Sequence, residues 1–266
     1  QVLSGIEHSS VRHGYSILIA SATSKTRDKH FPFNLTRARR IDGMLIVNEN
    51  KNIWNLTALK QEGVPFVFVN RFMADPQAPC VAPDDEGGGR MATAHLVGLG
   101  HRRIGVITGS PRVSATQGRL DGYRHALAAA GIALDAALVE RGLFQQGVET
   151  GRRGAEKLLA LKQPPTAIFA FSDELAMGVM QAARARGLRI PEDLAVVGYD
   201  NVAFSAHLSP ALTTVAQNPY LIGTTACELL VELLEGRRPQ KVNHLIPVRL
   251  VVRDSCGSKL RPAATR

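Results

Sequence analysis

Residues 167–200 carry the clearest fold signal in this chain: AIFAFSDELAMGVMQAARARGLRIPEDLAVVGYD. The stretch begins with a continuous apolar run, typical of a strand that is covered on both faces. Ser172-Asp173 then supplies a helix N-cap, and Gly187 is a typical residue for the end of the helix that follows. A second apolar run at 194–198 completes a strand–helix–strand unit. This order predicts parallel strands joined by a crossover helix.

The same alternation of apolar runs and helical patterns continues along most of the chain, which predicts an α/β protein. The expected strands cover 16–20, 44–47, 66–69, 104–108, 167–171, 194–198 and 245–252. The expected helices cover 88–99, 119–130, 150–161, 174–186 and 221–234. Four of these helices precede a glycine that can serve as a C-cap, namely Gly100, Gly131, Gly187 and Gly236. The polar end, 257–266, is expected to fray.

Composition narrows the class of protein. The 266 residues are 45% hydrophobic and 21% charged, which excludes a disordered or fibrous chain. No apolar run approaches the roughly 18 residues of a membrane-spanning helix, so no membrane partner is expected. The net charge of +9 is dispersed, which favours an ordinary solvated surface over a direct role for nucleic acid or another anion. Three widely spaced cysteines fit neither a disulfide framework nor a metal site and favour the cytoplasm.

Searches for catalytic motifs find no Walker P-loop, His-Glu-x-x-His, Cys-x-x-Cys or Gly-x-Ser-x-Gly. The triple glycine 87–89 opens a helix, but the carboxylates of Asp84-Asp85-Glu86 would repel an anion there. The eight histidines show no ligand spacing. We therefore expect no cofactor, no metal and no enzymatic activity. An enzyme that uses Asp173 or Asp200 as a base is kept as a minor alternative.

Polar residues follow several expected strands. Ligands of parallel α/β sheets bind outside the carboxyl ends of the strands, where loops and helix starts converge. Five such positions offer hydrogen-bonding groups without an obvious nucleophile and base, which favours recognition of a polar small molecule. For the aspartates at strand ends, capping of a helix or turn is the structural alternative. The five positions are Asn70, Arg119, Ser172, Asp200 and Gln217.

Six stretches occur in the order known from one protein family. They are GHRRI at 100–104, GRLDGY at 118–123, FSDELAMG at 171–178, VVGYDN at 196–201, PALTTV at 210–215 and VRDSCG at 252–257. Together they resemble the effector-binding core of the lactose/galactose-repressor (LacI/GalR) family of bacterial transcription regulators. The resemblance extends from about residue 41 to 257.

The resemblance implies a fold of two doubly wound parallel-sheet lobes, like that of periplasmic binding proteins, with a cleft between them. Three crossovers are expected near Pro83, Ala216 and Pro247. The first lobe would then comprise residues 1–83 and a return segment 217–246. The second lobe would comprise 84–216 and a return segment 247–257, followed by a tail over 258–266.

The resemblance also implies the residues that contact the effector. Arg119, which opens the Arg-Leu-x-Gly-aromatic motif, would hold effector oxygens, and it suits a hydroxyl or a phosphate oxygen equally. Asp200, after Gly-Tyr, would accept hydrogen bonds from hydroxyl or amine groups. Phe144 is expected to stack on the effector.

Two positions depart from the family pattern and imply a less charged pocket. Ser172 stands where the family often has Asn before the helix Asp, and Asn70 stands where the family has an acidic residue. Gln217 matches a polar position of the family near the second crossover.

The implied function is the effector-sensing and dimerisation module of a bacterial transcriptional regulator. A sugar or sugar derivative would bind in the cleft and modulate DNA binding. The helix-turn-helix of the family is absent before Gln1, so operator DNA would be contacted only through that missing domain. The alternative is a periplasmic sugar-binding protein of a transport system. An upstream helix-turn-helix would exclude the transport protein, and a signal peptide would exclude the regulator.

A homodimer is the expected assembly, because the family pairs side by side and the heptads of its tetrameric members are missing after Gly257. Two segments could supply the surface: 53–59 around Trp54, and the helix before His13. The apolar residues of that helix are Val2, Leu3, Ile6 and Val11. The segment Thr26–Thr36 is shorter than the helix that the family has there.

Overall fold

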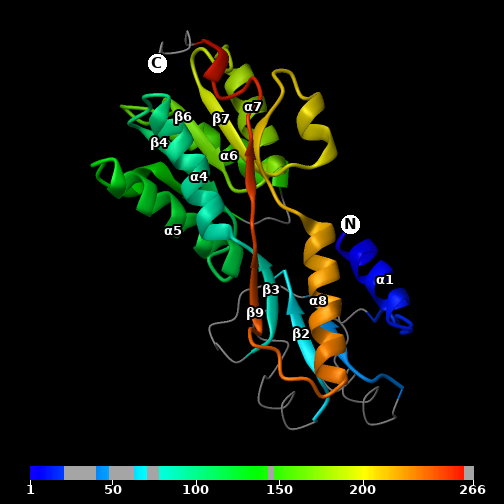
Figure 1. Cartoon of the computed structure of the whole chain (residues 1–266). Helices are drawn as coiled ribbons and strands as arrows, with labels where there is room; N and C mark the ends of the chain where they lie inside the picture. The colour runs from blue at the N-terminus through cyan, green and yellow to red at the C-terminus, as the bar shows by residue number, and fades with distance from the viewer. Residues whose placement is uncertain (21–39, 48–62, 71–77, 143–146, 261–266) are drawn as a thin grey trace, which may run out of the picture. The chain divides into compact units, whose positions relative to one another are not determined.

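The computed structural model describes residues 1–20, 40–47, 63–70, 78–142 and 147–260. The chain divides into two compact units, drawn in Figure 1. The first unit contains Gln1–Pro83 and Asn218–Ile246, and the second contains Asp84–Gln217 and Pro247–Arg266. The predicted α/β class with mainly parallel sheets is confirmed. Gln217 belongs to the second unit, where the sequence interpretation had assigned it to the first.

The first unit is built on a parallel sheet with the strand order β1-β2-β3-β9. Helix α8 (Pro219–Leu234) covers this sheet, and helix α1 (Val2–Arg12) packs on α8 (Figure 1). The two helices approach closely because a Cβ on Gly5 or Gly223 would overlap backbone of the other helix. The strands are β1 (Met44–Ile46), β2 (Phe66–Val69), β3 (Cys80–Pro83) and β9 (Asn243–Ile246).

The second unit is built on a sheet with the order β10-β8-β7-β6-β4-β5, in which only β10 is antiparallel to its neighbour. Most of its strands are buried throughout, as the continuous apolar runs predict. The strands are β4 (Ile104–Thr108), β5 (Val139–Arg141), β6 (Ala167–Ala170), β7 (Ala195–Asp200), β8 (Thr213–Ala216) and β10 (Arg249–Val251).

Helices cover both faces of this second sheet. The pair α4 (Asp85–Gly98) and α5 (Ser114–Ala129) is in mutual contact, and so is the pair α6 (Gly147–Leu158) and α7 (Asp173–Ala185). Successive residues of β7 separate the two pairs: Gly198 contacts α7, and Tyr199 contacts α4. Because side chains alternate along a strand, α4 and α7 lie on opposite faces of the sheet.

Three sequence predictions about the elements are wrong. Residues 16–20 form no strand, because no described strand pairs with their backbone, and Ile17, Leu18 and Ile19 are exposed. The expected strand 245–252 is two strands, β9 and β10, which belong to different sheets and flank Pro247. Residues Ser258–Leu260, part of the end expected to fray, form a short 3-10 helix, whereas 261–266 lie outside the described residues.

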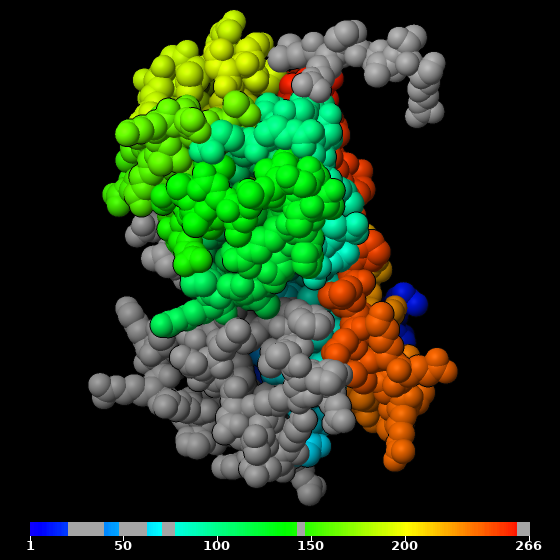
Figure 2. All heavy atoms as spheres, turned by 90° about the vertical axis from the view of Figure 1, so that its left-hand side faces the viewer, coloured from blue at the N-terminus to red at the C-terminus, as the bar shows by residue number. Residues whose placement is uncertain are grey.

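Helices α4 and α5 pack with their backbones nearly in contact. A Cβ on Gly89 would overlap the carbonyl oxygen of Arg119, and a Cβ on Gly122 would overlap that of Glu86. The two helices lie side by side on the face of the second unit that Figure 2 shows. This close approach sets the distance between the first turn of α4 and the second turn of α5, where Arg119 lies.

Asp173 ties the start of α7 to two other parts of the second unit. Its carboxylate accepts hydrogen bonds from Thr214 Oγ1 at 2.6 Å and from the Val202 backbone N–H at 2.9 Å. The residue is 1% exposed. Burial raises the pKa of Asp173 to about 7, although its two hydrogen bonds oppose the shift. Asp173 is therefore a structural carboxyl group whose charge state changes near neutral pH.

The packing of α4 on α5 predicts that Gly122→Ala destabilises the protein. The added methyl group has no room between the two backbones, and overpacking of this kind costs about 1–3 kcal/mol. Gly98→Ala is the matched control, because Gly98 is also helical and an added Cβ there would meet no atom within 4 Å. Urea denaturation should show a loss for Gly122→Ala and no loss for Gly98→Ala. Equal stabilities for both variants would contradict the packing described above.

Asp173 predicts a specific dependence of stability on pH. Its pKa rises from 3.8 to about 7 on folding, so the folded protein holds a proton that the unfolded chain has lost. The resulting stabilisation is complete below about pH 4 and is lost as the pH rises through 7. Between pH 5 and pH 8, the wild-type unfolding free energy should fall by about 2–3 kcal/mol more than that of Asp173→Asn. Denaturation at both pH values tests this, and parallel changes would show the assignment to be wrong.

Candidate functional site

Asp200 stands at the carboxyl end of β7, and its side chain is 31% exposed. Its backbone is in the left-handed region with φ of 104°, followed by Asn201 with φ of 53°. Gln217, directly after β8, donates from Nε2 to Asp200 Oδ1 at 2.6 Å. Arg119 Nη2 lies 3.7 Å from the same oxygen. The structure therefore brings together three of the residues predicted from the sequence, at the edge of the sheet where ligands of parallel α/β folds bind.

Arg119 lies beneath this edge and is 5% exposed. Its Nε donates to Asp85 Oδ1 at 2.8 Å, and its Nη1 donates to the carbonyl oxygen of Phe171 at the end of β6. The guanidinium carbon lies 3.6 Å from the centre of the Tyr199 ring, in a cation–π contact. Elements α4, α5, β6 and β7 thus meet at one guanidinium group.

The charges at this edge affect each other's ionisation. Burial alone would lower the pKa of Arg119, but the carboxylates of Asp85 and Asp200 raise it, so the guanidinium keeps its charge. Partial burial raises the pKa of Asp200 to about 6, because Asp85 and Glu174 add to the effect of desolvation while Arg119 and Gln217 oppose it. Asp200 is therefore a carboxylate at neutral pH that becomes a neutral acid just below it.

Asp85 is the site residue that the sequence analysis did not assign. Its side chain is 13% exposed, and its Oδ1 accepts the hydrogen bond from Arg119 Nε. The acidic run 84–86 was noticed only as a group that would repel anions at the start of a helix. Pairing with an arginine 34 positions away requires the packing of α4 on α5, which no local pattern indicates.

The other predicted site residues are not part of this cluster of Arg119, Asp200 and Gln217. Ser172 is the N-cap of α7, and its Oγ accepts from the Leu175 N–H at 3.2 Å. Asn70 belongs to the first unit, where it ends β2 with φ of 60° and its N–H donates to Val81 O at 2.7 Å. Phe144 and the segments 26–36 and 53–59 lie outside the described residues.

The triple glycine 87–89 is explained by packing. A Cβ on Gly88 would overlap the Tyr199 hydroxyl, and Gly89 lies against the backbone of Arg119. Asp84 already caps this helix, because its Oδ1 accepts from the Gly87 N–H at 2.8 Å. One N–H of this helix start is therefore taken by the protein, and Asp85 and Glu86 in its first turn oppose the binding of an anion there.

Cys256 and His95 form a pair that resembles a nucleophile with a base: Cys256 Sγ lies 3.3 Å from His95 Nε2. Although burial opposes it, hydrogen bonding to His95, Ser258 and Thr213 lowers the pKa of Cys256 to about 6. The thiol is 0% exposed and belongs to the hydrophobic core of the second unit. A substrate therefore has no access to it in this conformation.

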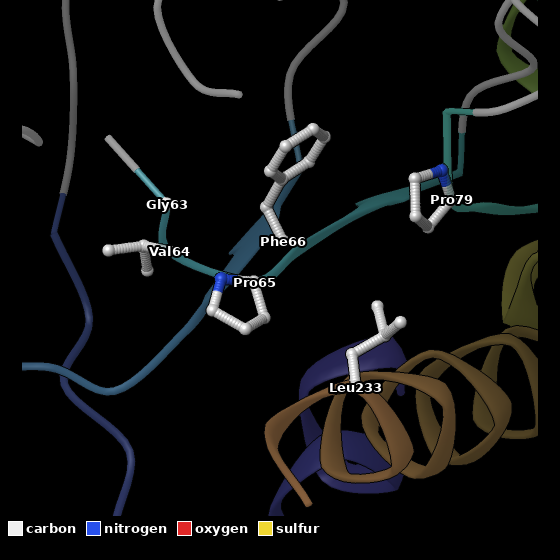
Figure 3. Close-up of a pocket in the computed structure, with 6 residues that line it drawn as sticks. All are labelled: Gly63, Val64, Pro65, Phe66, Pro79 and Leu233. Atoms are coloured by element: carbon white, nitrogen blue, oxygen red, sulfur yellow. The ribbon is translucent and has the colours of Figure 1, made fainter. Parts of the chain in front are cut away.

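An apolar hollow lies in the first unit, at the amino ends of β2 and β3, with a volume of about 290 Å³. Figure 3 shows that it is bordered by apolar side chains and by prolines that precede the strands. None of the described residues that line it is charged, and it lies at the end of the strands opposite to Asn70. The lining residues are Gly63, Val64, Pro65, Phe66, Pro79 and Leu233.

Two further properties concern the described residues only. They contain no group of three or more His, Cys, Asp and Glu side chains placed to hold a metal ion. None of the described helices has the length and apolar character needed to cross a bilayer.

Comparisons with known proteins agree with this architecture. Residues 93–256 match the family described as periplasmic binding protein-like domain. The chain is 33% identical over 255 residues to the HTH-type transcriptional repressor CytR of Escherichia coli (strain K12), and the match covers 96% of this chain and 74% of that protein.

Two solved structures extend the comparison. The transcriptional regulator CelR in complex with cellobiose has a TM-score of 0.88 and 33% identity, covering 96% of this chain and 77% of that one. A LacI family transcriptional regulator from Enterococcus faecium with bound ribose has a TM-score of 0.80 and 28% identity, covering 96% and 92%. The resemblance deduced from the six sequence stretches is thereby confirmed: this chain belongs to the LacI family of transcriptional regulators and comprises their effector-sensing core.

Proposed function

We propose that this chain recognises a sugar or sugar derivative at the carboxyl edge of the second unit's sheet, with Asp200 as the principal contact. The observation that carries the proposal is the placement of Asp200, whose carboxylate is partly exposed and oriented by Gln217 at 2.6 Å. A carboxylate accepts hydrogen bonds only, so it suits the hydroxyl groups of a sugar. The cellobiose and ribose complexes of related regulators support this class of ligand.

Binding without chemical transformation is the second part of the proposal. The relatives are regulators, which makes the enzyme alternative the weaker one. Asp173 and Asp200, the two bases considered for it, are engaged with Thr214, Val202 and Gln217. The buried Cys256–His95 pair offers no accessible nucleophile. Cofactor-free recognition fits this set of side chains.

In the regulator, the effector would act by favouring one conformation over another. A ligand shifts such an equilibrium only by its difference in affinity for the two states. Asp200 and Arg119 suit this role because they join β7, α4 and α5 through one set of contacts. A helix-turn-helix domain, as in the HTH-type repressor CytR, would read operator DNA, which places the proposed regulator in the cytoplasm.

The proposal predicts that Asp200→Ala weakens effector binding at least about tenfold, since hydrogen bonds to charged groups contribute about 1.5–3 kcal/mol each. A thermal-shift screen of sugars and nucleosides identifies the strongest ligand, and calorimetry measures its affinity. Asp121→Ala is the matched control, because Asp121 is an exposed acid on α5 that pairs with Arg124. Unchanged affinity of Asp200→Ala, with the control also unchanged, would refute the site.

We also propose that two copies pair through α1. This helix buries Ile6 against its own unit but exposes Leu3 by 49% and Val11 by 71%. Tyr220 and Leu221 at the start of α8 are exposed by 43% and 41%, and Tyr220 Oη lies 3.0 Å from His8 Nδ1 of α1. A two-fold pair would bury this apolar surface on both copies and needs upwards of about 1,000 Å² to be stable.

The dimer is expected to sediment at twice the 28.7 kDa mass of the chain at tens of micromolar. The double variant Leu3→Glu, Val11→Glu should sediment as a monomer, because buried charges without partners oppose association. Leu134→Glu serves as control, since Leu134 is 48% exposed in the second unit. A wild-type protein that sediments only as a monomer, or a double variant that still dimerises, would contradict the proposed surface.

A further inference from the structure

Acidic side chains surround the Arg119 guanidinium at the carboxyl edge of the second unit's sheet. Arg119 lies between the carboxylates of Asp85 at 2.8 Å and Asp200 at 3.7 Å. Glu174 acts on Asp200 as a further negative charge. A ligand that approaches the exposed Asp200 therefore meets the charges of three acidic side chains beside that of Arg119.

Two of the N–H donors of Arg119 are used by the protein. A guanidinium group has five N–H donors in a fixed fork, and it binds phosphate best when two parallel donors are free. Here Nε is bonded to Asp85 and Nη1 to the Phe171 carbonyl, while one face of the group is covered by Tyr199. Nη2, which has the looser contact at 3.7 Å to Asp200, retains capacity for a ligand oxygen. A phosphate that used the fork of Nε and Nη2 would have to displace Asp85 from Nε, whereas a hydroxyl needs a single N–H.

Two helix starts at this edge already carry acidic side chains. Helix N-termini attract anions through their free N–H groups and partial positive charge. The first turn of α4 already carries Asp85 and Glu86, and that of α7 carries Asp173 and Glu174. Asp84 and Ser172 cap these two helices with their own side chains. Helix α5 has no acid in its first turn, so Arg119 in its second turn is the group that would attract an anion there.

Asp85 is held in place to pair with Arg119. Position 118, next to Arg119, is a glycine, and a Cβ there would lie 2.9 Å from Asp85 Cβ. The glycine contacts between α4 and α5 hold the two charged residues side by side. At 13% and 6% side-chain exposure, the pair is shielded from solvent, so salt screens it little.

We infer that Asp85 makes this edge selective for uncharged, hydroxyl-bearing effectors, by occupying the Arg119 guanidinium that a phosphate or carboxylate ligand would need. This inference rests on the proposed function, since it concerns the ligand of the same edge. From the sequence alone, Arg119 suits a hydroxyl and a phosphate oxygen equally, and the pairing with Asp85 favours the hydroxyl. Asp85 thereby acts as a specificity-determining residue.

The test compares matched pairs of ligands that differ by one phosphate: ribose and ribose 5-phosphate, glucose and glucose 6-phosphate, adenosine and adenosine 5′-monophosphate. Calorimetry on the whole chain gives the ratio of dissociation constants within each pair. For the pair that the wild-type protein binds most tightly, the phosphorylated member should bind at least about tenfold more weakly, which corresponds to about 1.4 kcal/mol. Tighter or equal binding of the phosphorylated member would overturn the inference while supporting a ligand site at this edge.

Asp85→Asn tests the assigned residue, because the amide keeps an acceptor for Arg119 Nε but removes the negative charge. The ratio should shift at least about fivefold toward the phosphorylated ligand, a change of about 1 kcal/mol. Asp85→Glu retains the charge and should retain the discrimination, which keeps the test valid if the Asn variant folds poorly. Asp121→Asn removes the same charge from the surface of α5 and should leave the ratio unchanged.

The outcomes separate this inference from the proposed function. A ratio that Asp85→Asn leaves unchanged shows that phosphate is rejected by shape and overturns the role of Asp85. Failure of the folded wild-type protein to bind any member of the panel or of the wider sugar screen contradicts the proposed function itself. Selective binding of the uncharged members, reduced by Asp85→Asn and retained by Asp85→Glu, supports both.

Discussion

The burial of one positive charge organises the second unit. Removing a guanidinium group from water is costly unless the group is paired and hydrogen-bonded. Arg119 meets this requirement with Asp85 from α4, the Phe171 carbonyl from β6, and the ring of Tyr199 from β7. Each partner must hold its position for the charge to stay buried. The pairing therefore fixes where two helices and two strands stand at the effector edge.

Glycine makes this arrangement possible on both faces of the sheet. Gly89 and Gly122 let the backbones of α4 and α5 come close enough for Asp85 to reach Arg119. On the other face, α6 and α7 approach in the same way, because a Cβ on Gly151 would overlap the Leu175 carbonyl and one on Gly178 that of Val148. The glycines thus let the helix backbones approach closely, and this approach sets where the charged side chains on the helices lie.

The effector edge combines a rigid base with one accessible carboxylate. Asp173 and Arg119 are buried, whereas Asp200 is partly exposed and stands on a strained backbone with φ of 104°. Strain of this kind is common where a side chain must be presented to a ligand. An effector that hydrogen-bonds to Asp200 thereby contacts a group connected to α4, α5 and β8, as a sensor requires.

Local patterns in the sequence were enough to predict most of the elements and the family, although the strands β3 and β5 were not among those expected. Apolar runs and capping residues such as Ser172 and Gly187 are local signals, and most strands and helices began within a few residues of the predicted positions. Arg119, Asp200 and Gln217 could also be named, because they follow strands and match family motifs. Three features depended on partners distant in the chain: residues 16–20 form no strand, 245–252 is divided between two sheets, and Asp85 pairs with Arg119. Only the tertiary structure decided these three features. Strand pairing and buried ion pairs join segments that are distant in the sequence, and a local pattern does not indicate which segments will meet.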